Sequence, residues 1–182
     1  FGGSMVHAGT FFGDMLPNFS RHVPGKVYAF EPVLENFVLA NQCVQRNQLE
    51  NVILFNAGLG AEIASMKVST TSPKGVHAGG GSRISDEGEI CVVMDIDRIN
   101  FTDLTMIQLD VEGFELNTLN GAQQTIRTHR PIVAIEDNRK KCDAFLAENE
   151  YEFVHQLSGL AVWCPKENAV YLDFLRRTYP AT

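Results

Sequence analysis

Short apolar runs alternate with segments of helical periodicity along most of the chain. An apolar run of about four to eight residues bounded by turn formers is typical of a buried strand, whereas apolar residues every three to four positions indicate a helix. The predicted strands are residues 5–8, 26–30, 52–55, 90–94, 105–109, 132–135, 151–157, 160–164 and 169–172. The predicted helices are residues 14–22, a helix that follows Pro32, and residues 113–128 and 138–150. The helix after Pro32 is expected to bury one apolar face, formed by Leu34, Phe37, Val38 and Val44.

One segment, residues 69–89, interrupts this alternation. It holds a cluster of turn-forming residues, namely Pro73, Gly75, Gly79, Gly80, Gly81 and Gly88, together with several serines. Such a cluster is typical of either a mobile lid or an elaborated hairpin. We interpret it as an insertion within a single domain at residues 1–182, because a domain typically holds about 100–200 residues.

Strands that alternate with helices predict an α/β fold built on a parallel sheet, with helices on both faces. The late strands 160–164 and 169–172 are expected to form an antiparallel hairpin. Ligands bind such sheets beyond the carboxyl ends of the strands. The polar residues that end the strands are therefore the main candidates for a site, namely residues 9–14, Glu31, Asn56, Asp110 and Glu136.

Composition narrows the classes of protein and partner. The 182 residues include 15 Lys and Arg against 22 Asp and Glu, which gives a net charge of −7. This balance argues against a broad nucleic-acid-binding surface. No apolar stretch approaches the roughly 18 residues of a membrane span. The four cysteines form no C-x-x-C pair, so we expect reduced, buried thiols, no metal site and a cytoplasmic location.

Two glycines, Gly9 and Gly13, lie between the first predicted strand and the helix after it. Glycine lets a ligand approach the main chain closely, and a helix N-terminus behind the loop offers free N–H groups. The spacing is not the Gly-x-Gly-x-x-Gly of dinucleotide-binding loops, which argues against a nicotinamide-dependent oxidoreductase. A tight structural turn explains these glycines as well as a ligand loop does.

Glu31 ends the second predicted strand. A carboxylate at this position can accept hydrogen bonds from the hydroxyls of a ribose. The alternative is a carboxylate that only stabilises the start of the next helix. Together with the glycine loop, Glu31 favours an adenosine-containing ligand.

Three carboxylates, Asp110, Glu112 and Glu115, follow the strand at residues 105–109. Acids in the first turn of a helix stabilise it, which accounts for one or two of them. Asp110 is expected to face the crevice above the sheet.

These motifs resemble the FkbM-type methyltransferases, a branch of the class I methyltransferases that use S-adenosylmethionine (SAM). The most specific part is Leu109-Asp110-Val111-Glu112-Gly113-Phe114-Glu115 with Gly121-Ala122 downstream. The whole resemblance spans residues 5–136 and is carried by residues 7–14, 27–32, 93–97, 107–115, 119–122 and 131–136. It implies a Rossmann-like sheet of seven strands, parallel except for one late strand.

The resemblance also implies SAM as the cofactor and a hydroxyl oxygen of a small molecule or saccharide as the methyl acceptor. The loop at residues 9–13 would hold the methionine part of SAM, Glu31 the ribose, and Asp110 the amino group. Asn56 and Ala57 would lie by the adenine. The full set of expected cofactor-binding residues is His7, Ala8, Gly9, Thr10, Phe11, Phe12, Gly13, Asp14, Glu31, Pro32, Asn56, Ala57 and Asp110.

His7 is a departure, because members of the family commonly carry an acidic residue there. An imidazole cannot replace a carboxylate that faces an ammonium, although Asp14 or Asp110 could compensate. The alternative function is therefore an inactive relative that serves as an adenosine-binding or interaction module. The chain begins directly at its first predicted strand, so we expect a minimal or truncated methyltransferase.

An alcohol acceptor benefits from a general base. The candidates are Asp110, Glu112, Glu136 and His77, and Glu112 or His77 is preferred because the cofactor needs Asp110. The alternative for His77 is a solvated loop histidine. The candidates for acceptor binding are Arg83, Ser82 and Glu136, where Arg83 would bind an anionic acceptor or is a surface charge. No oligomeric state is predicted.

Overall fold

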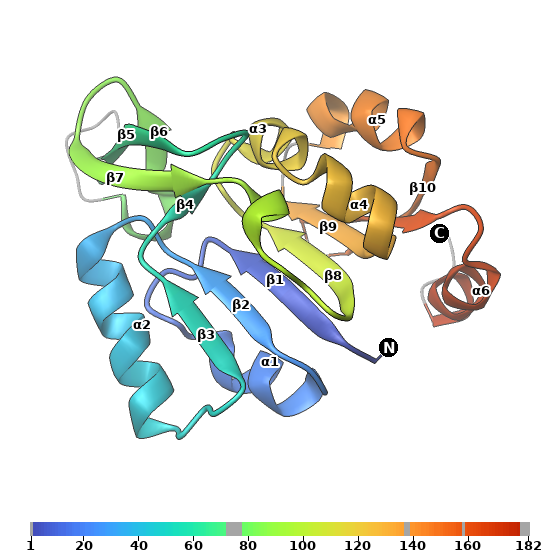
Figure 1. Ribbon diagram of the computed structural model, residues 1–182, viewed down its shortest axis with the longest axis horizontal. Helices are drawn as coiled ribbons and strands as arrows, with labels where there is room; N and C mark the ends of the chain where they lie inside the picture. Colours follow the sequence, from blue (N-terminus) through green and yellow to red (C-terminus); the bar gives the residue numbers. More distant parts are fainter. Residues whose placement is uncertain (1, 72–77, 137–138, 158, 179–182) are drawn as a thin grey trace.

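A sheet of seven strands organises the computed structural model, which describes residues 2–71, 78–136, 139–157 and 159–178. In spatial order its strands are β10 (Tyr151–Leu157), β11 (Leu160–Pro165), β9 (Ile132–Glu136), β8 (Leu104–Leu109), β1 (Ser4–Ala8), β2 (Val27–Phe30) and β3 (Val52–Phe55). The strands from β9 to β3 pair in parallel, and β11 pairs antiparallel with both β9 and β10. The predicted seven-stranded, mostly parallel sheet is confirmed (Figure 1).

The strand order creates a crevice at the carboxyl ends of β1 and β8. The chain runs outward from β1 to β3 and then returns to the other side of β1, where β8 pairs Ala8 with Leu109. Parallel sheets bind ligands at such a reversal of direction. The backbone N–H of Asp110 donates to the carbonyl of Ala8 at 3.1 Å, so the segments that leave β1 and β8 begin side by side.

Helices cover both faces of the sheet, as predicted (Figure 1). One face packs against α1 (Leu16–His22), α2 (Leu34–Arg46) and α6 (Ala169–Thr178). The other face packs against α3 (Glu115–Asn120), α4 (Gln123–His129) and α5 (Arg139–Glu148). Within the described ranges, no helix has both the length and the apolar character needed to cross a bilayer.

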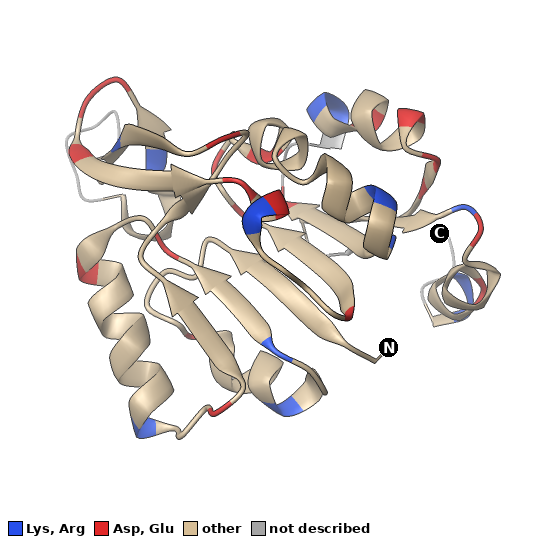
Figure 2. Ribbon diagram, viewed as in Figure 1, with Lys and Arg blue, Asp and Glu red and all other residues tan. Residues whose placement is uncertain are grey.

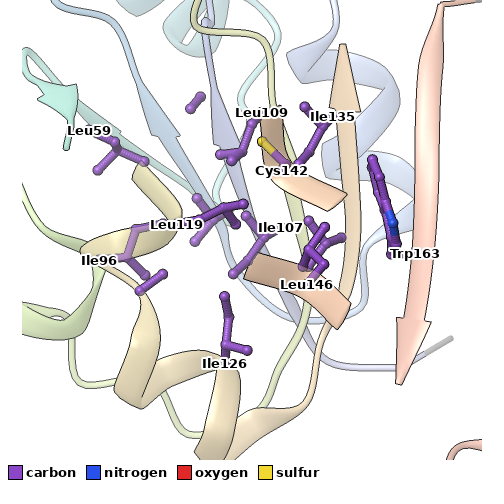
Figure 3. Close-up of a cluster of buried hydrophobic side chains, with 14 of the residues drawn as sticks. Leu59, Ile96, Ile107, Leu109, Leu119, Ile126, Ile135, Cys142, Leu146 and Trp163 are labelled. Atoms are coloured by element: carbon purple, nitrogen blue, oxygen red, sulfur yellow. The ribbon is translucent and has the colours of Figure 1, made fainter. Parts of the chain in front are cut away.

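The larger part of the core lies under α3, α4 and α5 (Figure 3). Ile107, Leu119 and Ile126 are fully buried there, and a buried side chain of this size contributes about 1.5–3 kcal/mol. Cys142 lies in the same cluster, and burial raises the pKa of its thiol to about 12. All four cysteines are unpaired, and each of them except the half-buried Cys43 is buried.

The predicted helix 113–128 is divided into α3 and α4. A Cβ atom at Gly121 would lie 2.0 Å from the carbonyl oxygen of Gly60, so this close approach of two backbones occurs where the helix is interrupted. Asp97 then caps α4, because its carboxylate accepts from the backbone N–H groups of Gln124 and Thr125 at 3.0 and 2.7 Å. A cap from a distant segment restarts the helix.

The prediction of a strand at residues 169–172 is wrong, because these residues begin α6. Asn168 accepts a hydrogen bond from the backbone N–H of Tyr171 at 3.1 Å, which is the geometry of a helix N-cap. Leu172 and Leu175 are buried at helical spacing. The antiparallel hairpin is formed one element earlier, by β10 and β11.

The predicted apolar face of α2 is wrong for Leu34 and Val38, whereas Val44 packs against the core as predicted. The helix packs through the buried Asn36 and Ala40, whereas Leu34 and Val38 are exposed. A Cβ atom at Gly13 would lie 3.0 Å from the Cα of Ala40, so small residues allow α2 to lie close to the glycine loop. Leu34, Val38 and Leu39 remain on the outer side of the helix.

A second, smaller sheet lies beside the carboxyl edge of the first (Figure 1). In spatial order its strands are β4 (Gly58–Leu59), β7 (Glu89–Met94), β5 (Ala64–Ser69) and β6 (Arg83–Ser85). Because β5 pairs antiparallel with both β6 and β7, the described part of the glycine-rich segment fits the elaborated hairpin rather than an irregular lid. The predicted strand 90–94 is β7 and belongs to this sheet.

Candidate functional site

A cleft lies between the carboxyl edge of the large sheet and the small sheet. It holds about 540 Å³ of space, its open mouth included. The large sheet and its loops contribute Ala8, Gly9, Phe11, Phe30, Glu31, Pro32, Asn36, Asp110, Val111 and Phe114. The opposite wall is formed by Gly58, Leu59, Val68, Gly80, Ser82 and Ile84. The cleft thus occupies the edge at which the sequence predicts a ligand site.

The glycine loop folds tightly over the end of β2. The backbone N–H groups of Gly9 and Thr10 both donate to the carbonyl of Phe30, at 3.2 and 3.1 Å. Gly9 has a φ of +86° and Phe11 a φ of +51°, so the backbone turns twice through the left-handed region. For Phe11 this conformation is uncommon and requires support from its surroundings.

The Gly9→Ala variant is expected to lower the free energy of unfolding by about 2–4 kcal/mol, through strain and steric overlap. A Cβ atom at Gly9 would lie 1.8 Å from the carbonyl oxygen of Asp110, and its φ is positive. Thermal unfolding followed by circular dichroism should show a Tm roughly 5–15 °C below that of the parent. The control is Gly2→Ala, because a Cβ there meets nothing within 4 Å. Equal Tm values for the two variants would contradict the close approach.

Glu31 provides the support for the loop. Its side chain is 4 % exposed, and its Oε2 accepts from the backbone N–H of Phe11 at 2.7 Å. Its Oε1 accepts from the backbone N–H of Val33 at 2.9 Å. Burial raises the pKa of this carboxyl, while these two hydrogen bonds and one with Asn36 oppose the shift. Each carboxylate oxygen has two lone pairs, so Glu31 can still accept hydrogen bonds from a ligand.

Asn56 and Ala57, the residues expected beside an adenine, do not line the cleft, although the next two residues, Gly58 and Leu59, do. Asn56 instead donates to the carbonyls of Glu31 and Pro32, at 2.9 and 3.3 Å. It therefore holds the backbone around the carboxylate in place.

Asp110 and Glu136 form a carboxyl pair at the ends of neighbouring strands. The two residues before them, Leu109 and Ile135, are register partners, and the side chains of the pair are hydrogen-bonded. Ionised carboxylates only accept hydrogen bonds, so this contact requires a proton. Burial first, and then the hydrogen bond and the negative charge of Glu136, raise the pKa of Asp110 to about 8. The raised pKa of Asp110 favours a form of the pair that keeps one proton at neutral pH, at the end of the cleft that Asp110 lines.

The loop after Asp110 is strained and is held by Glu115. Glu112 and Gly113 have φ values of +52° and +99°. The Oε1 atom of Glu115 accepts from the backbone N–H groups of Gly113 and Val111, at 3.0 and 3.4 Å. Glu115 lies in the first turn of α3, as in the alternative explanation, but its hydrogen bonds hold the preceding loop rather than cap the helix. Glu112 is exposed and does not line the cleft, although its Oε1 atom lies 3.7 Å from the position of a Cβ on Gly81, a residue between the cleft-lining Gly80 and Ser82.

His7 lies outside the cleft, on the face of the sheet that packs against α1. Its Nδ1 atom is hydrogen-bonded to Oε1 of Gln108, and its ring contacts the Phe19 ring edge-on at 4.9 Å. Burial lowers the pKa of His7 to about 4, so the imidazole is neutral at physiological pH. Its neighbour Ala8 lines the cleft instead. His7 therefore adds no positive charge that would repel a cationic ligand.

Of the other expected site residues, some line the cleft and some do not. Ser82 lines the cleft and donates to the carbonyl of Gly79 at 3.0 Å. Its neighbour Arg83 is exposed and does not line the cleft. His77 lies outside the described residues. Four more residues of the glycine loop shape or flank it without lining the cleft, namely Thr10, Gly13 and the exposed Phe12 and Asp14.

Sequence reasoning missed the wall that the small sheet provides. Val68 on β5 and Ile84 on β6 line the cleft, and Phe114 faces it from the loop before α3. The signal for β5 is the alternation of apolar and polar residues in Ala-Ser-Met-Lys-Val-Ser, which has the period of a half-buried strand. The turn-forming glycines that follow this segment predict a loop and obscure the short strand pattern.

Metal ligation has no geometric basis in the part of the chain that the structure describes. No group of three His, Cys, Asp or Glu side chains there lies close enough to hold an ion.

Comparisons with solved structures identify methyltransferase folds. An FkbM methyltransferase from Methylobacillus flagellatus KT is 20% identical and has a TM-score of 0.64, over 90% of this chain and 43% of that one. This chain therefore spans less than half of that protein. An rRNA methylase from Streptococcus thermophilus is 14% identical, with a TM-score of 0.53 over 90% of this chain and 87% of that one. A SAM-dependent methyltransferase from Aquifex aeolicus is 15% identical, with a TM-score of 0.53 over 89% and 81%.

A match to a family model assigns the chain to a protein family. No curated protein matches the chain. Residues 7–158 match the family model of the methyltransferase FkbM domain. In chain order this range runs from the end of β1 to the end of β10 and includes the whole small sheet. With most of its length matched, and with the fold of such enzymes around a cleft lined by Gly9, Glu31 and Asp110, this chain belongs to the FkbM methyltransferase domain family.

Proposed function

We propose that the chain binds SAM in the cleft and transfers its methyl group to a hydroxyl oxygen of a small molecule or saccharide. The observation that carries this proposal is the buried carboxylate of Glu31, which lines the cleft beside the glycine loop. Backbone N–H groups orient both of its oxygens and leave lone pairs for the two hydroxyls of a ribose.

The charges around the cleft suit a cation. SAM carries a sulfonium and an ammonium, and the described residues that line the cleft include Glu31 and Asp110 but no Lys or Arg. Gly9 lines the cleft at the turn of the loop, where its missing Cβ makes room for the carbonyl oxygen of Asp110. In this arrangement Glu31 would hold the ribose, the loop at Gly9 the methionine part, and Asp110 with Glu136 the ammonium.

Bound SAM would supply an electrophilic methyl group on a positively charged sulfur. The residues of the chain would mainly orient the reactants and exclude water, and the apolar side chains of Leu59, Val68 and Phe114 line the cleft for that purpose. Glu112 would accept the proton of the acceptor hydroxyl, because its exposed carboxylate lies close to Gly81, next to the cleft-lining Ser82. A general base contributes about 10²–10⁴-fold to the rate. His77 stays a second prediction for this role.

Ser82 is the acceptor-binding residue that this geometry favours, since its hydroxyl lines the cleft. Because Arg83 does not line it, we propose an uncharged rather than an anionic acceptor. A cytoplasmic location belongs to the same proposal, because the four thiols are unpaired. An uncharged polyol or saccharide also fits the acidic character of the chain better than a nucleic acid does.

Calorimetric titration with SAM tests the cofactor, and methyl transfer from isotopically labelled SAM to a panel of sugars and alcohols tests the reaction. We expect binding in the micromolar range and label in at least one uncharged acceptor. Absence of binding at high micromolar SAM would overturn the proposal. Binding without transfer to any acceptor would favour the inactive adenosine-binding module.

A further inference from the structure

The side of α2 that faces away from the sheet is unusually apolar. Leu34 is 59% exposed, and Val38 and Leu39 are each 45% exposed. Single exposed aliphatic side chains are common, but a contiguous group on one helix marks an interaction surface. With the exposed Glu35, Gln42 and Arg46, these residues form what we call the outer face of α2.

The charges on this face lie only at its two ends (Figure 2). Glu35 is in the first turn of α2 and Arg46 in the last, with no other charged residue between them. The spacing between them is close to three helical turns, so both project to the same side of the helix. Neither forms an ion pair with another residue among those described.

We propose that the outer face of α2 packs against the same face of a second copy of the chain, with the two helices antiparallel across a two-fold axis. The antiparallel arrangement brings Glu35 of each copy next to Arg46 of the other, and a parallel arrangement would oppose like charges. Val38 and Leu39 of both copies then lie in the middle of the contact. A two-fold axis makes the interface self-complementary, which this distribution of charge allows.

The size of α2 limits the strength of this dimer. Its 13 residues make a helix about 20 Å long, so one helix from each copy makes a small interface. We therefore expect a dimer that dissociates in the micromolar range. Because α2 faces the sheet with its other side, the inference is independent of what the cleft binds.

Charge reversal tests the pairing directly. Sedimentation equilibrium of the full chain over roughly 1–500 µM should show a reversible monomer–dimer equilibrium. The variants Glu35→Arg and Arg46→Glu should each weaken the dimer by about tenfold, because each places two pairs of like charges in contact. The double variant Glu35→Arg with Arg46→Glu should restore the dimer to within about threefold of the parent.

Two further variants complete the experiment. Glu62→Arg reverses an exposed charge outside α2 and should leave the equilibrium unchanged. Val38→Asp should weaken the dimer, and the charge-reversed pair at positions 35 and 46 should not restore it. The Tm of Val38→Asp should match that of the parent because the side chain is exposed. A monomer at every concentration, as a different protein partner would produce, overturns the proposal. So does a dimer that tolerates Glu35→Arg, or single reversals that the double variant does not rescue.

Discussion

Replacing Glu31 with Gln is expected to lower the affinity of the chain for SAM by about 100-fold or more. A hydrogen bond to a charged group contributes about 1.5–3 kcal/mol, and a ribose would make two of them with this carboxylate. Gln has one acceptor atom where Glu31 has two, and its amide N–H₂ would oppose the backbone N–H of Phe11 or of Val33. Calorimetric titration with SAM gives the change in Kd.

The matched control for Glu31→Gln is Glu50→Gln, which makes the same substitution at an exposed position just after α2. We expect its affinity for SAM to equal that of the parent. Circular dichroism should show that both variants keep the folded sheet. If the folded Glu31→Gln chain binds SAM as tightly as the parent, the carboxylate does not hold the cofactor.

Binding of SAM is expected to release close to one proton at pH 7. In the free chain the pKa of Asp110 is raised to about 8, so the pair with Glu136 holds a proton at neutral pH. An ammonium beside the pair favours its ionised form and displaces that proton. The affinity for SAM should therefore rise with pH between pH 6 and 7.5, by up to about tenfold per unit. Calorimetry in two buffers of different ionisation enthalpy counts the proton directly.

The Asp110→Asn variant is expected to release no proton from this pair and to bind SAM weakly, with little dependence on pH. Whereas the substitution weakens the binding of SAM, it should raise the free energy of unfolding at high pH. A carboxyl whose pKa is raised from 3.8 to about 8 favours the folded state fully below pH 4 and loses that contribution as the pH rises to 8. At pH 8.5 the variant should be more stable by about 1–3 kcal/mol, after allowance for solvent screening.

Thermal unfolding at pH 4 and pH 8.5 measures this difference. The Tm of Asp110→Asn should match the parent at pH 4 and exceed it by roughly 3–10 °C at pH 8.5. Asp103→Asn changes an aspartate elsewhere and should show no such growth with pH. Equal Tm values for Asp110→Asn and the parent at both pH values would show that the pair does not hold a proton in the folded state.

The sequence was sufficient to predict the large sheet, because its strands are short apolar runs that alternate with helices. It also predicted that Gly9, Glu31 and Asp110 lie together, since parallel strands bring their carboxyl ends to one edge. The partners of His7 could not be predicted. Its neutral state depends on burial and on Gln108, which is distant in sequence and leaves no local pattern.

Contacts between distant segments explain why parts of the secondary structure and packing were predicted wrongly. Large aliphatic residues on α2 predict a buried face, yet Ala40 packs there because Gly13 allows close approach. A short apolar run at residues 169–172 is compatible with a strand or a helix, and the N-cap at Asn168 decides for the helix. The small sheet depends on pairing between β5 and β7, which flank the glycine-rich segment.

The two acidic features of the cleft differ in what they do for the folded chain. Glu31 accepts hydrogen bonds from the backbone of the glycine loop, so a chain that had lost its cofactor would still benefit from keeping it. The Asp110–Glu136 pair has the opposite effect, because at neutral pH it weakens the fold that holds it. Selection for stability alone would remove such a pair. Under the proposed function, the carboxyl pair is therefore kept for the cation that it would bind and not for the stability of the fold.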